Sequence, residues 1–304
     1  MSHQTPNQLL GEIVRELSEP RSLKGLFHEH RDGDPLPSGP ALNECIDICR
    51  AILFPGFYGN SNMNSHTLPY HIGVGVERLY KLLSEQINAG LCFECRECGC
   101  AKARELALEF IARLPKLREL LATDVEAAYN GDPAADSYGE IISCYPVIKA
   151  ITNYRIAHEL LTLGVPLIPR IIAEMAHSET GIDIHPAATI GHHFTIDHGT
   201  GVVIGATCII GNHVKLYQGV TLGARSFPLD EQGNPIKGIP RHPILEDDVI
   251  VYSNATILGR ITLARGTVVG GNLWVTQSTK PGEQLVQAKK RKTNLIRPED
   301  FGGL

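Results

Sequence analysis

One short group of ionisable residues, Asp197-His198-Gly199, lies inside the most regular stretch of this sequence, from Asp183 to Val220. Histidine titrates near neutral pH, so it is the natural proton acceptor when a hydroxyl group must become a nucleophile. A carboxylate on one imidazole nitrogen sets the ring's tautomer and stabilises its protonated form. The group Asp197-His198-Gly199 therefore suggests a site built on a regular backbone, with His198 as the candidate base.

Four thiols within nine residues, Cys92, Cys95, Cys98 and Cys100, form a second group with possible chemistry. Thiolates are good ligands for zinc and for iron–sulfur clusters. Two of the four are separated by a single residue, and no second pair lies further along the chain. The segment is therefore interpreted either as a metal site or as a cysteine-rich surface loop between two helices.

A six-residue period predicts the element that positions Asp197 and His198. The positions that repeat at this step are apolar: Ile184, Ile190, Ile196, Val202, Cys208, Val214 and Val220. Such a period fits a parallel β-helix, in which each hexad supplies one short strand and a turn. The same step continues through Ile244, Ile250, Thr256, Thr262, Val268 and Trp274. The gap before Ile244 is four hexads, so we expect a loop at 224–243 that leaves the phase intact.

The apolar spacing in the first 180 residues predicts a series of helices, which are separated by turn-forming segments rich in Gly and Pro. Apolar spacing predicts separate helices over 101–113, 115–129, 138–151 and 153–163, among others. We expect an α-helical domain at 1–180, a β-helix domain at 181–280 with the inserted loop, and a tail at 281–304. The fold class is therefore α+β.

Composition narrows the class of protein. The 304 residues carry a net charge of −5, with 43% hydrophobic and 20% charged residues. This balance is ordinary for a globular protein and does not favour nucleic acid or an anionic membrane as a partner. No secretory signal or membrane-spanning run is evident, and the eight cysteines suit reduced thiols in the cytoplasm.

Several strings then identify a family. DIHPAATIG begins at Asp183, DHGTGVVIG at Asp197 and VKLYQGVTLG at Val214. RHP stands at 241–243, GDPAAD at 131–136 and NYRIAHEL at 153–160. Together they resemble the serine O-acetyltransferases, which belong to the hexapeptide-repeat, left-handed β-helix acyltransferases. The resemblance covers about residues 125–280 and implies a left-handed β-helix.

The resemblance implies acetyl transfer from acetyl-CoA to the hydroxyl of L-serine, giving O-acetyl-L-serine for cysteine biosynthesis. It assigns His198 as general base and Asp183 as the residue that orients it. It also implies that Asp132 and Asp197 bind the serine ammonium and that Arg241 binds the carboxylate. His242 would complete the substrate pocket. These charges suit an amino acid, because an ammonium needs an anion and a carboxylate suits the guanidinium fork.

The family position of the acetyl-CoA wall is the backbone around Gly223, Ala224, Ser253 and Gly271. Small residues there would let a pantetheine arm approach the coil closely. The resemblance further implies a homotrimer or a dimer of trimers, with sites between subunits, and no metal ion. Some relatives bind O-acetylserine sulfhydrylase through a C-terminal tail ending in Ile; here the tail ends in Leu304.

Three alternatives remain open. The acceptor could be another hydroxy amino acid such as homoserine. His193 and His198 have the H-x4-H spacing of γ-class carbonic anhydrases, so a zinc hydratase is a second possibility. A non-catalytic assembly subunit is the third. A lone histidine in a β-helix turn is more commonly a hydrogen-bonded surface residue. We therefore assign no role to His192, His193 or His213.

Overall fold

The computed structural model describes residues 5–24, 26, 36–59, 62–94, 100–226 and 228–287. Cys95, Cys98 and the side chain of Cys100 lie outside the described part, as does Leu304, so the metal hypothesis for the cysteine segment and the tail hypothesis stay predictions. Two compact units make up the chain, residues 1–36 and 37–304.

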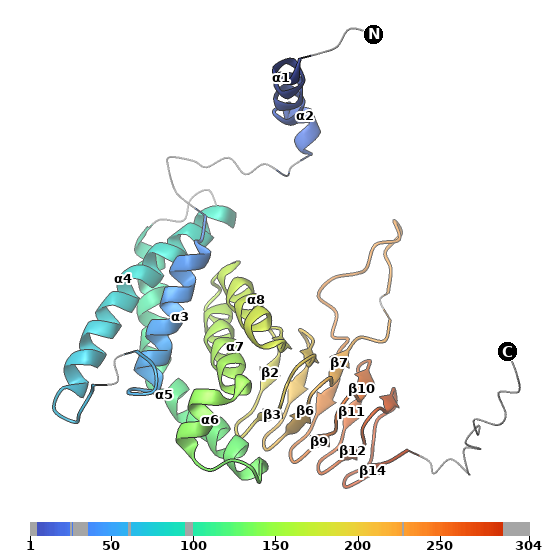
Figure 1. The fold of residues 1–304 in the computed structure, drawn as a ribbon. Coiled ribbons are helices and arrows are strands. Elements are labelled where there is room, and N and C mark those ends of the chain that lie inside the picture. Colours follow the sequence, from blue (N-terminus) through green and yellow to red (C-terminus); the bar gives the residue numbers. More distant parts are fainter. Residues whose placement is uncertain are drawn as a thin grey trace, which may run out of the picture. The chain divides into compact units, whose positions relative to one another are not determined.

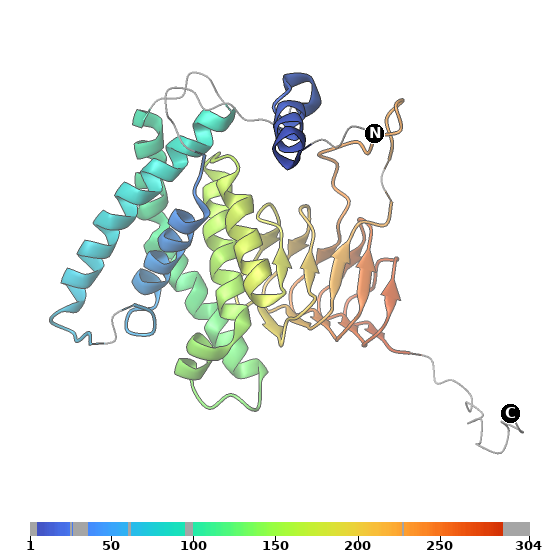
Figure 2. The same cartoon turned by 45° about the horizontal axis from the view of Figure 1, so that its top comes forward.

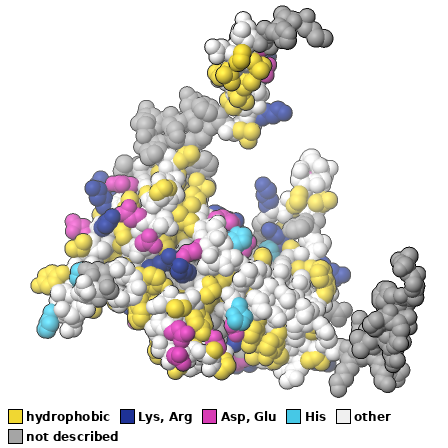
Figure 3. Space-filling model, viewed as in Figure 1, with side chains coloured by type: hydrophobic (Ala, Val, Ile, Leu, Met, Phe, Trp, Pro, Cys, Tyr) yellow, Lys and Arg dark blue, Asp and Glu magenta, His cyan; other side chains and the backbone are white. Residues whose placement is uncertain are grey.

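The first unit contains α1 (Pro6–Leu17) and α2 (Pro20–Leu23). Thr5 and Gln8 form a capping box at the start of α1, which satisfies backbone N–H groups that have no partner inside the helix. Hydrophobic side chains gather on α1 (Figure 3), and Leu10, Val14 and Leu17 are exposed.

In the described part of the second unit, six helices come first: α3 (Gly39–Leu53), α4 (Leu68–Glu94), α5 (Cys100–Gly131), α6 (Tyr138–Cys144), α7 (Pro146–Thr162) and α8 (Ile168–Thr180). Among the described helices, none is both long enough and apolar enough to cross a membrane. The predicted division into helices at 101–113 and 115–129 was wrong, because α5 continues through Pro115. Buried Phe110, Leu114 and Leu117 hold both halves of α5 in the core.

The boundary between α6 and α7 also differs from the prediction. It lies at Tyr145, whose extended backbone (φ −80°, ψ 124°) precedes Pro146 at the start of α7. A residue before proline avoids the helical conformation, and proline is well suited to the first turn of a helix. The Tyr-Pro pair therefore sets this break.

Fourteen short strands follow among the described residues, and they form three parallel sheets. The first sheet contains β1 (Asp183–Ile184), β4 (Val203–Ile204), β7 (Thr221–Gly223), β10 (Thr256–Leu258) and β13 (Trp274–Val275). The second contains β2 (Thr189–Ile190), β5 (Ile209–Ile210), β8 (Ile244–Leu245) and β11 (Thr262–Leu263). The third contains β3 (Thr195–Asp197), β6 (Lys215–Tyr217), β9 (Ile250–Val251), β12 (Val268–Val269) and β14 (Gln284–Leu285). The chain visits the sheets in turn, so it winds as a three-sided β-helix (Figure 1), and the predicted fold class is confirmed.

Strand pairing reveals where the six-residue period is interrupted. Val203 pairs with Thr221, eighteen residues later, but Asp183 pairs with Val203, twenty residues later. Two extra residues therefore lie in the turn after β3, which contains His198. The seven predicted positions from Ile184 to Val220 are all buried. Each hexad has two inward positions, one within the strand and one just before it. Up to Ile196 the six-residue step falls on the strand position, but from Val202 onwards it falls on the position just before the strand.

The inserted loop changes the phase, contrary to the prediction. Thr221 pairs with Thr256, thirty-five residues later, so the loop adds seventeen residues, which is not a multiple of six. The predicted line through Ile244 to Trp274 was therefore wrong, and the side chain of Trp274 is 71% exposed. The inward residues are each one position later: Leu245, Val251, Ile257, Leu263, Val269 and Val275. The loop itself projects away from the coils (Figure 1).

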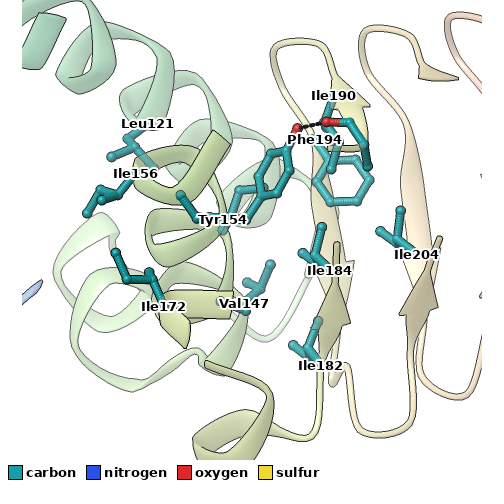
Figure 4. Packing of buried hydrophobic residues seen from close by; sticks show 14 of the residues in the cluster. Leu121, Val147, Tyr154, Ile156, Ile172, Ile182, Ile184, Ile190, Phe194 and Ile204 are labelled. Carbon is teal, nitrogen blue, oxygen red and sulfur yellow. Dashed lines mark hydrogen bonds between the residues drawn. The ribbon is translucent and has the colours of Figure 1, made fainter. Parts of the chain in front are cut away.

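The core continues from the helices into the first coil. Helices α7 and α8 contact β1, and α5 and α7 contact β3 (Figure 2). Buried Tyr154 of α7 packs near Ile184 and Phe194, and its hydroxyl donates to the Ala188 carbonyl at 2.7 Å (Figure 4). The end of the β-helix that faces the helices is therefore covered by apolar side chains, and α5 packs directly against β3.

Candidate active site

The candidate residues lie on the edges of the three-sided β-helix, where successive turns stack. We call the turns after β3, β6, β9 and β12 the first edge. The turns after β1, β4, β7 and β10 form the second edge, and those after β2, β5, β8 and β11 form the third edge. Turns on one edge are joined by backbone hydrogen bonds, for example Gly219 N to the Thr200 carbonyl at 2.9 Å.

His198 stands on the first edge, in the enlarged turn. Its backbone is left-handed (φ 57°), and Gly199 follows with φ 96°. A Cβ on Gly199 would lie 2.4 Å from Ile182 Cδ1, so this position requires glycine. The enlarged turn leaves the His198 side chain 76% exposed, with Nδ1 3.7 Å from Oδ1 of Asp197. The imidazole is thus accessible to a substrate and lies beside a carboxylate.

Asp132 lies near Asp197, although 65 residues separate the two aspartates in the chain. Both line a small pocket together with Gly131, Tyr145 and Lys215. The Tyr145 hydroxyl donates to Asp132 Oδ2 at 2.6 Å, and Ala134 N donates to Oδ1 at 2.8 Å. Both bonds favour the ionised carboxylate and lower the pKa of Asp132, with the Tyr145 bond the larger cause. The same bond raises the pKa of Tyr145 to about 12.

Lys215 lines the same pocket as the two aspartates, and the sequence analysis did not find it. Its Nζ lies 3.4 Å from Asp197 Oδ2 and donates to the Gly131 carbonyl at 2.6 Å. Burial by itself lowers the pKa of Lys215, but contacts with Tyr217 and Asp197 outweigh it, so the pKa is raised. Strand register is the observation that reveals Lys215. Lys215 pairs with Thr195 and Tyr217 pairs with Asp197 one coil below, so all four side chains face the same side of the sheet.

Asp183 is close to the first edge but is not in contact with His198. Its backbone N donates to the Val202 carbonyl at 2.9 Å, which places Asp183 one coil below the end of the enlarged turn. Among the described residues, no hydrogen bond or ion pair joins Asp183 to His198. A carboxylate oxygen of Asp183 instead lies within 4.8 Å of ligand atoms of Glu174 and His177.

Arg241 and His242 lie on the second edge, at the end of the inserted loop. His242 Nδ1 accepts from Thr207 N at 3.1 Å and lies 2.8 Å from Thr207 Oγ1. Burial, together with the charges of Arg241 and Arg260, lowers the pKa of His242 to about 4. Burial also lowers the pKa of nearby His185 to about 4, with smaller contributions from Arg170 and other cations. Both imidazoles are therefore neutral at pH 7.

Gly205 makes room for the His242 ring, and this contact provides a prediction. A Cβ at residue 205 would lie 2.1 Å from His242 Cδ2 and 2.2 Å from Nε2. Gly205→Ala should displace the ring from Thr207 and destabilise the fold by about 1–3 kcal/mol, as overpacking does. Thermal unfolding measures this change. Gly73→Ala, where a Cβ meets nothing within 4 Å, is the control. Equal melting temperatures for the two variants would contradict the prediction.

The two neutral histidines predict a pH dependence of stability. Their folded pKa of about 4 lies below the ordinary 6.5, so the unfolded chain binds more protons between these values. The free energy of unfolding should therefore fall as the pH decreases from 6.5 towards 4. Urea titrations at several pH values test this. The fall should be smaller in His242→Gln, and an identical fall in both proteins would exclude His242 as a cause.

The four residues expected to line the acetyl-CoA site lie on two edges. Ser253 and Gly271 stack on the first edge, where a Cβ on Gly271 would be 3.0 Å from the Ser253 carbonyl oxygen. Gly223 is the last residue of β7 and Ala224 follows it, so both lie at the start of the second edge. Within one chain, the described contacts bring Asp132, Asp197 and His198 together, and Arg241 with His242, as two separate clusters.

The zinc-hydratase alternative required His193 near His198. His193 lies on the third edge, in the turn after β2, and His198 lies on the first edge. His193 is instead surrounded by His192 and His213. The arrangement within one chain therefore does not favour this alternative.

The chain resembles known proteins along most of its length, although no protein-family model matches it. The plasmid serine acetyltransferase of Synechococcus elongatus is 49% identical over 279 residues, covering 89% of this chain and 86% of the relative. Serine acetyltransferase 1 of Entamoeba histolytica, solved in complex with L-cysteine, superposes with a TM-score of 0.72 at 32% identity, covering 90% and 94% of the two chains.

Soybean serine acetyltransferase, solved in complex with serine, superposes with a TM-score of 0.54 at 27% identity, covering 84% of this chain and 99% of that one. The identity and coverage of the Synechococcus relative extend across the helical region as well as the β-helix. The chain therefore belongs to the serine acetyltransferases, a family of acyltransferase enzymes.

Proposed function

We propose that this chain transfers the acetyl group of acetyl-CoA to the hydroxyl of L-serine, with His198 as general base. The observation that carries the proposal is the group formed by Asp132, Asp197 and His198 on the first edge, in a chain 49% identical to a serine acetyltransferase. The products are O-acetyl-L-serine and CoA.

His198 acts on the serine hydroxyl, which is a weak nucleophile near neutral pH. Nε2 of the imidazole accepts the hydroxyl proton as the serine oxygen attacks the thioester carbonyl. The tetrahedral intermediate then collapses, the C–S bond breaks, and the protonated imidazole returns its proton to the departing CoA sulfur. The exposure of the imidazole, 76% in the isolated chain, supports access by both substrates.

A carboxylate must hold Nδ1–H of the imidazole. Asp197 is the carboxylate nearest to it, at 3.7 Å, a distance that a small rotation of the ring converts into a hydrogen bond. Asp183 lies one coil below, at the start of β1 and close to the same edge, and we propose that it accepts from Nδ1–H when the ring turns towards the coil in the substrate complex. Catalytic hydrogen bonds often tighten only in such complexes.

The substrate ammonium is bound by Asp132 and Asp197. Each Asp132 oxygen already accepts one bond, but a carboxylate oxygen can accept two, so Asp132 retains capacity for the substrate. Its lowered pKa keeps it charged. Lys215 already neutralises part of the Asp197 charge, which makes Asp132 the stronger site for a second cation. Arg241 binds the serine carboxylate, and neutral His242 completes the pocket.

The separation of these groups onto two edges supports a site between subunits. The first edge carries the base and the anions, and the second edge carries Arg241 and His242. A homotrimer with three parallel β-helices brings the first edge of one chain to the second edge of its neighbour. Acetyl-CoA then lies along this interface, against Ser253 and Gly271 of one chain and Gly223 and Ala224 of the next.

A thiol-release assay tests the proposal directly. The purified chain is mixed with acetyl-CoA and one of L-serine, L-homoserine, L-threonine or D-serine, and free CoA is measured. We expect rapid release with L-serine, the acceptor of the proposed reaction. Faster release with L-homoserine than with L-serine would show that homoserine, and not serine, is the preferred acceptor. No release with any of them, in a folded trimer, would reject the enzymatic activity.

A further inference from the structure

Three histidines gather on the third edge, away from the acyl-transfer residues. The third-edge histidine cluster consists of His192, His193 and His213, and one ring nitrogen of each lies within 4.8 Å of the others. His192 Nδ1 and His193 Nδ1 are 2.7 Å apart. The ring of His213 stacks on His193 with centroids 4.4 Å apart and meets the ring of His192 edge-on at 5.2 Å.

Coil geometry explains why these side chains meet. Thr195 pairs with Lys215, so His193 and His213 occupy equivalent places in successive turns. Both have left-handed backbones (φ 54° and 57°), which point their side chains in the same direction. The His193 N–H also donates to Thr123 Oγ1 of α5 at 3.0 Å. The cluster is thus held by the turn of each coil and by the neighbouring helix.

Glu126 supplies the second observation. Its Oε2 lies 3.4 Å from His193 Nε2. When this carboxylate accepts from Nε2–H, the lone pair of His193 resides on Nδ1, the nitrogen that faces His192. A histidine that binds a metal commonly donates its other N–H to a carboxylate, which sets the tautomer and strengthens the ligand. The same arrangement exists here between helix α5 and the first coil.

We propose that the third-edge histidine cluster binds a divalent transition-metal ion such as Zn²⁺, Ni²⁺ or Co²⁺. Three neutral imidazoles are ligands that these ions prefer, whereas Mg²⁺ and Ca²⁺ prefer oxygen. Metal–nitrogen bonds of about 2.0–2.1 Å require the two Nδ1 atoms to separate by a few tenths of an ångström. The exposed rings of His192 and His213 can move that far. Glu126 is a positioning residue that orients His193.

Such an ion would join α5 to the first two coils. Glu126 and Thr123 contact His193 from the last turns of α5, and α5 ends at Gly131, beside Asp132. The metal therefore stabilises the packing of that helix end, and the role does not depend on which acyl acceptor the enzyme uses. We expect a higher melting temperature with the ion present, because binding favours the folded chain.

Isothermal titration with Co²⁺ on tag-free, chelator-treated full-length protein tests the proposal. A variant with all four cysteines of the segment replaced by serine (Cys92→Ser/Cys95→Ser/Cys98→Ser/Cys100→Ser) serves as the background, so that the cysteine segment does not contribute, and the unmodified chain is titrated in parallel. We expect one ion per chain, a visible absorption spectrum without a sulfur-to-metal charge-transfer band, and an increased melting temperature.

Variants then assign the ligands. His192→Ala/His213→Ala should abolish binding, and Glu126→Gln should weaken it about tenfold to a hundredfold, as loss of such a carboxylate does. His66→Ala, an exposed histidine far along the chain, should bind normally. Binding that persists in the double variant, or no binding by the background protein, would overturn the proposal. Circular dichroism confirms that each variant is folded before titration.

Discussion

Replacement of His198 by asparagine is expected to lower kcat for acetyl transfer to L-serine about a hundredfold to ten-thousandfold. The amide cannot accept the hydroxyl proton, so serine must attack without a general base. Asparagine is the informative substitution because it tolerates the left-handed backbone of residue 198 (φ 57°), so the turn is retained. Thiol release at saturating acetyl-CoA measures kcat and KM separately.

The control for this experiment is His66→Ala, which removes an exposed histidine from the segment before α4 and should leave kcat unchanged. Melting temperature and oligomer size of the His198 variant should match those of the unmodified protein, because the side chain is exposed. Turnover within threefold of normal in His198→Asn would reject His198 as the base and direct the search to another residue.

Replacement of Arg155 by methionine is expected to destabilise the folded chain by about 3–5 kcal/mol, the usual cost of leaving a buried charge without its partner. Arg155 Nε and Nη2 donate to the two Asp124 carboxylate oxygens at 2.6 and 2.9 Å, with both side chains almost completely buried. Nη2 also donates to the Gly191 carbonyl at 2.8 Å. Asp124 accepts in addition from Phe194 N at 3.1 Å. The pair therefore joins α5, α7 and the first coil.

Urea unfolding followed by circular dichroism measures the loss. Lys102→Met, which removes an exposed ion pair with Glu105, should change stability by less than about 1 kcal/mol. The double variant Asp124→Leu/Arg155→Met should recover part of the lost stability, since neither charge is then left alone. A single Arg155→Met variant as stable as Lys102→Met would contradict the assignment of this pair as a stabilising link between α5, α7 and the first coil.

The β-helix could be predicted from the sequence because its signal is local. Each hexad buries its own apolar residue, so Ile184, Ile190 and Ile196 predict the coil before any long-range contact is known. Phase across the inserted loop could not be predicted in this way. The length of a loop does not reveal how many of its residues stay in the coil, and the exposed Trp274 shows that the six-residue step no longer followed the inward row.

The candidate site likewise has a part that could be predicted from the sequence and a part that could not. Asp197 and His198 are adjacent in sequence, and the glycine that permits their turn follows directly. Asp132, Tyr145 and Lys215 come from a helix end, a Tyr-Pro junction and a strand, and they meet only because α5 packs against the first coils. Lys215 in particular was recognisable only after the register between β3 and β6 was known.

The amino-acid sequence by itself determined the repeating coil, the helical region and the identity of the residues capable of proton transfer and charge recognition. These depend on backbone preferences and burial patterns that act over a few residues. Only the tertiary structure decided that His198 is exposed on an enlarged turn, that Arg241 and His242 lie on a different edge, and that three histidines gather on the third. The stacking of the coils decides these distances. Stacking depends on strand register, and register is determined jointly by residues that lie far apart in the chain.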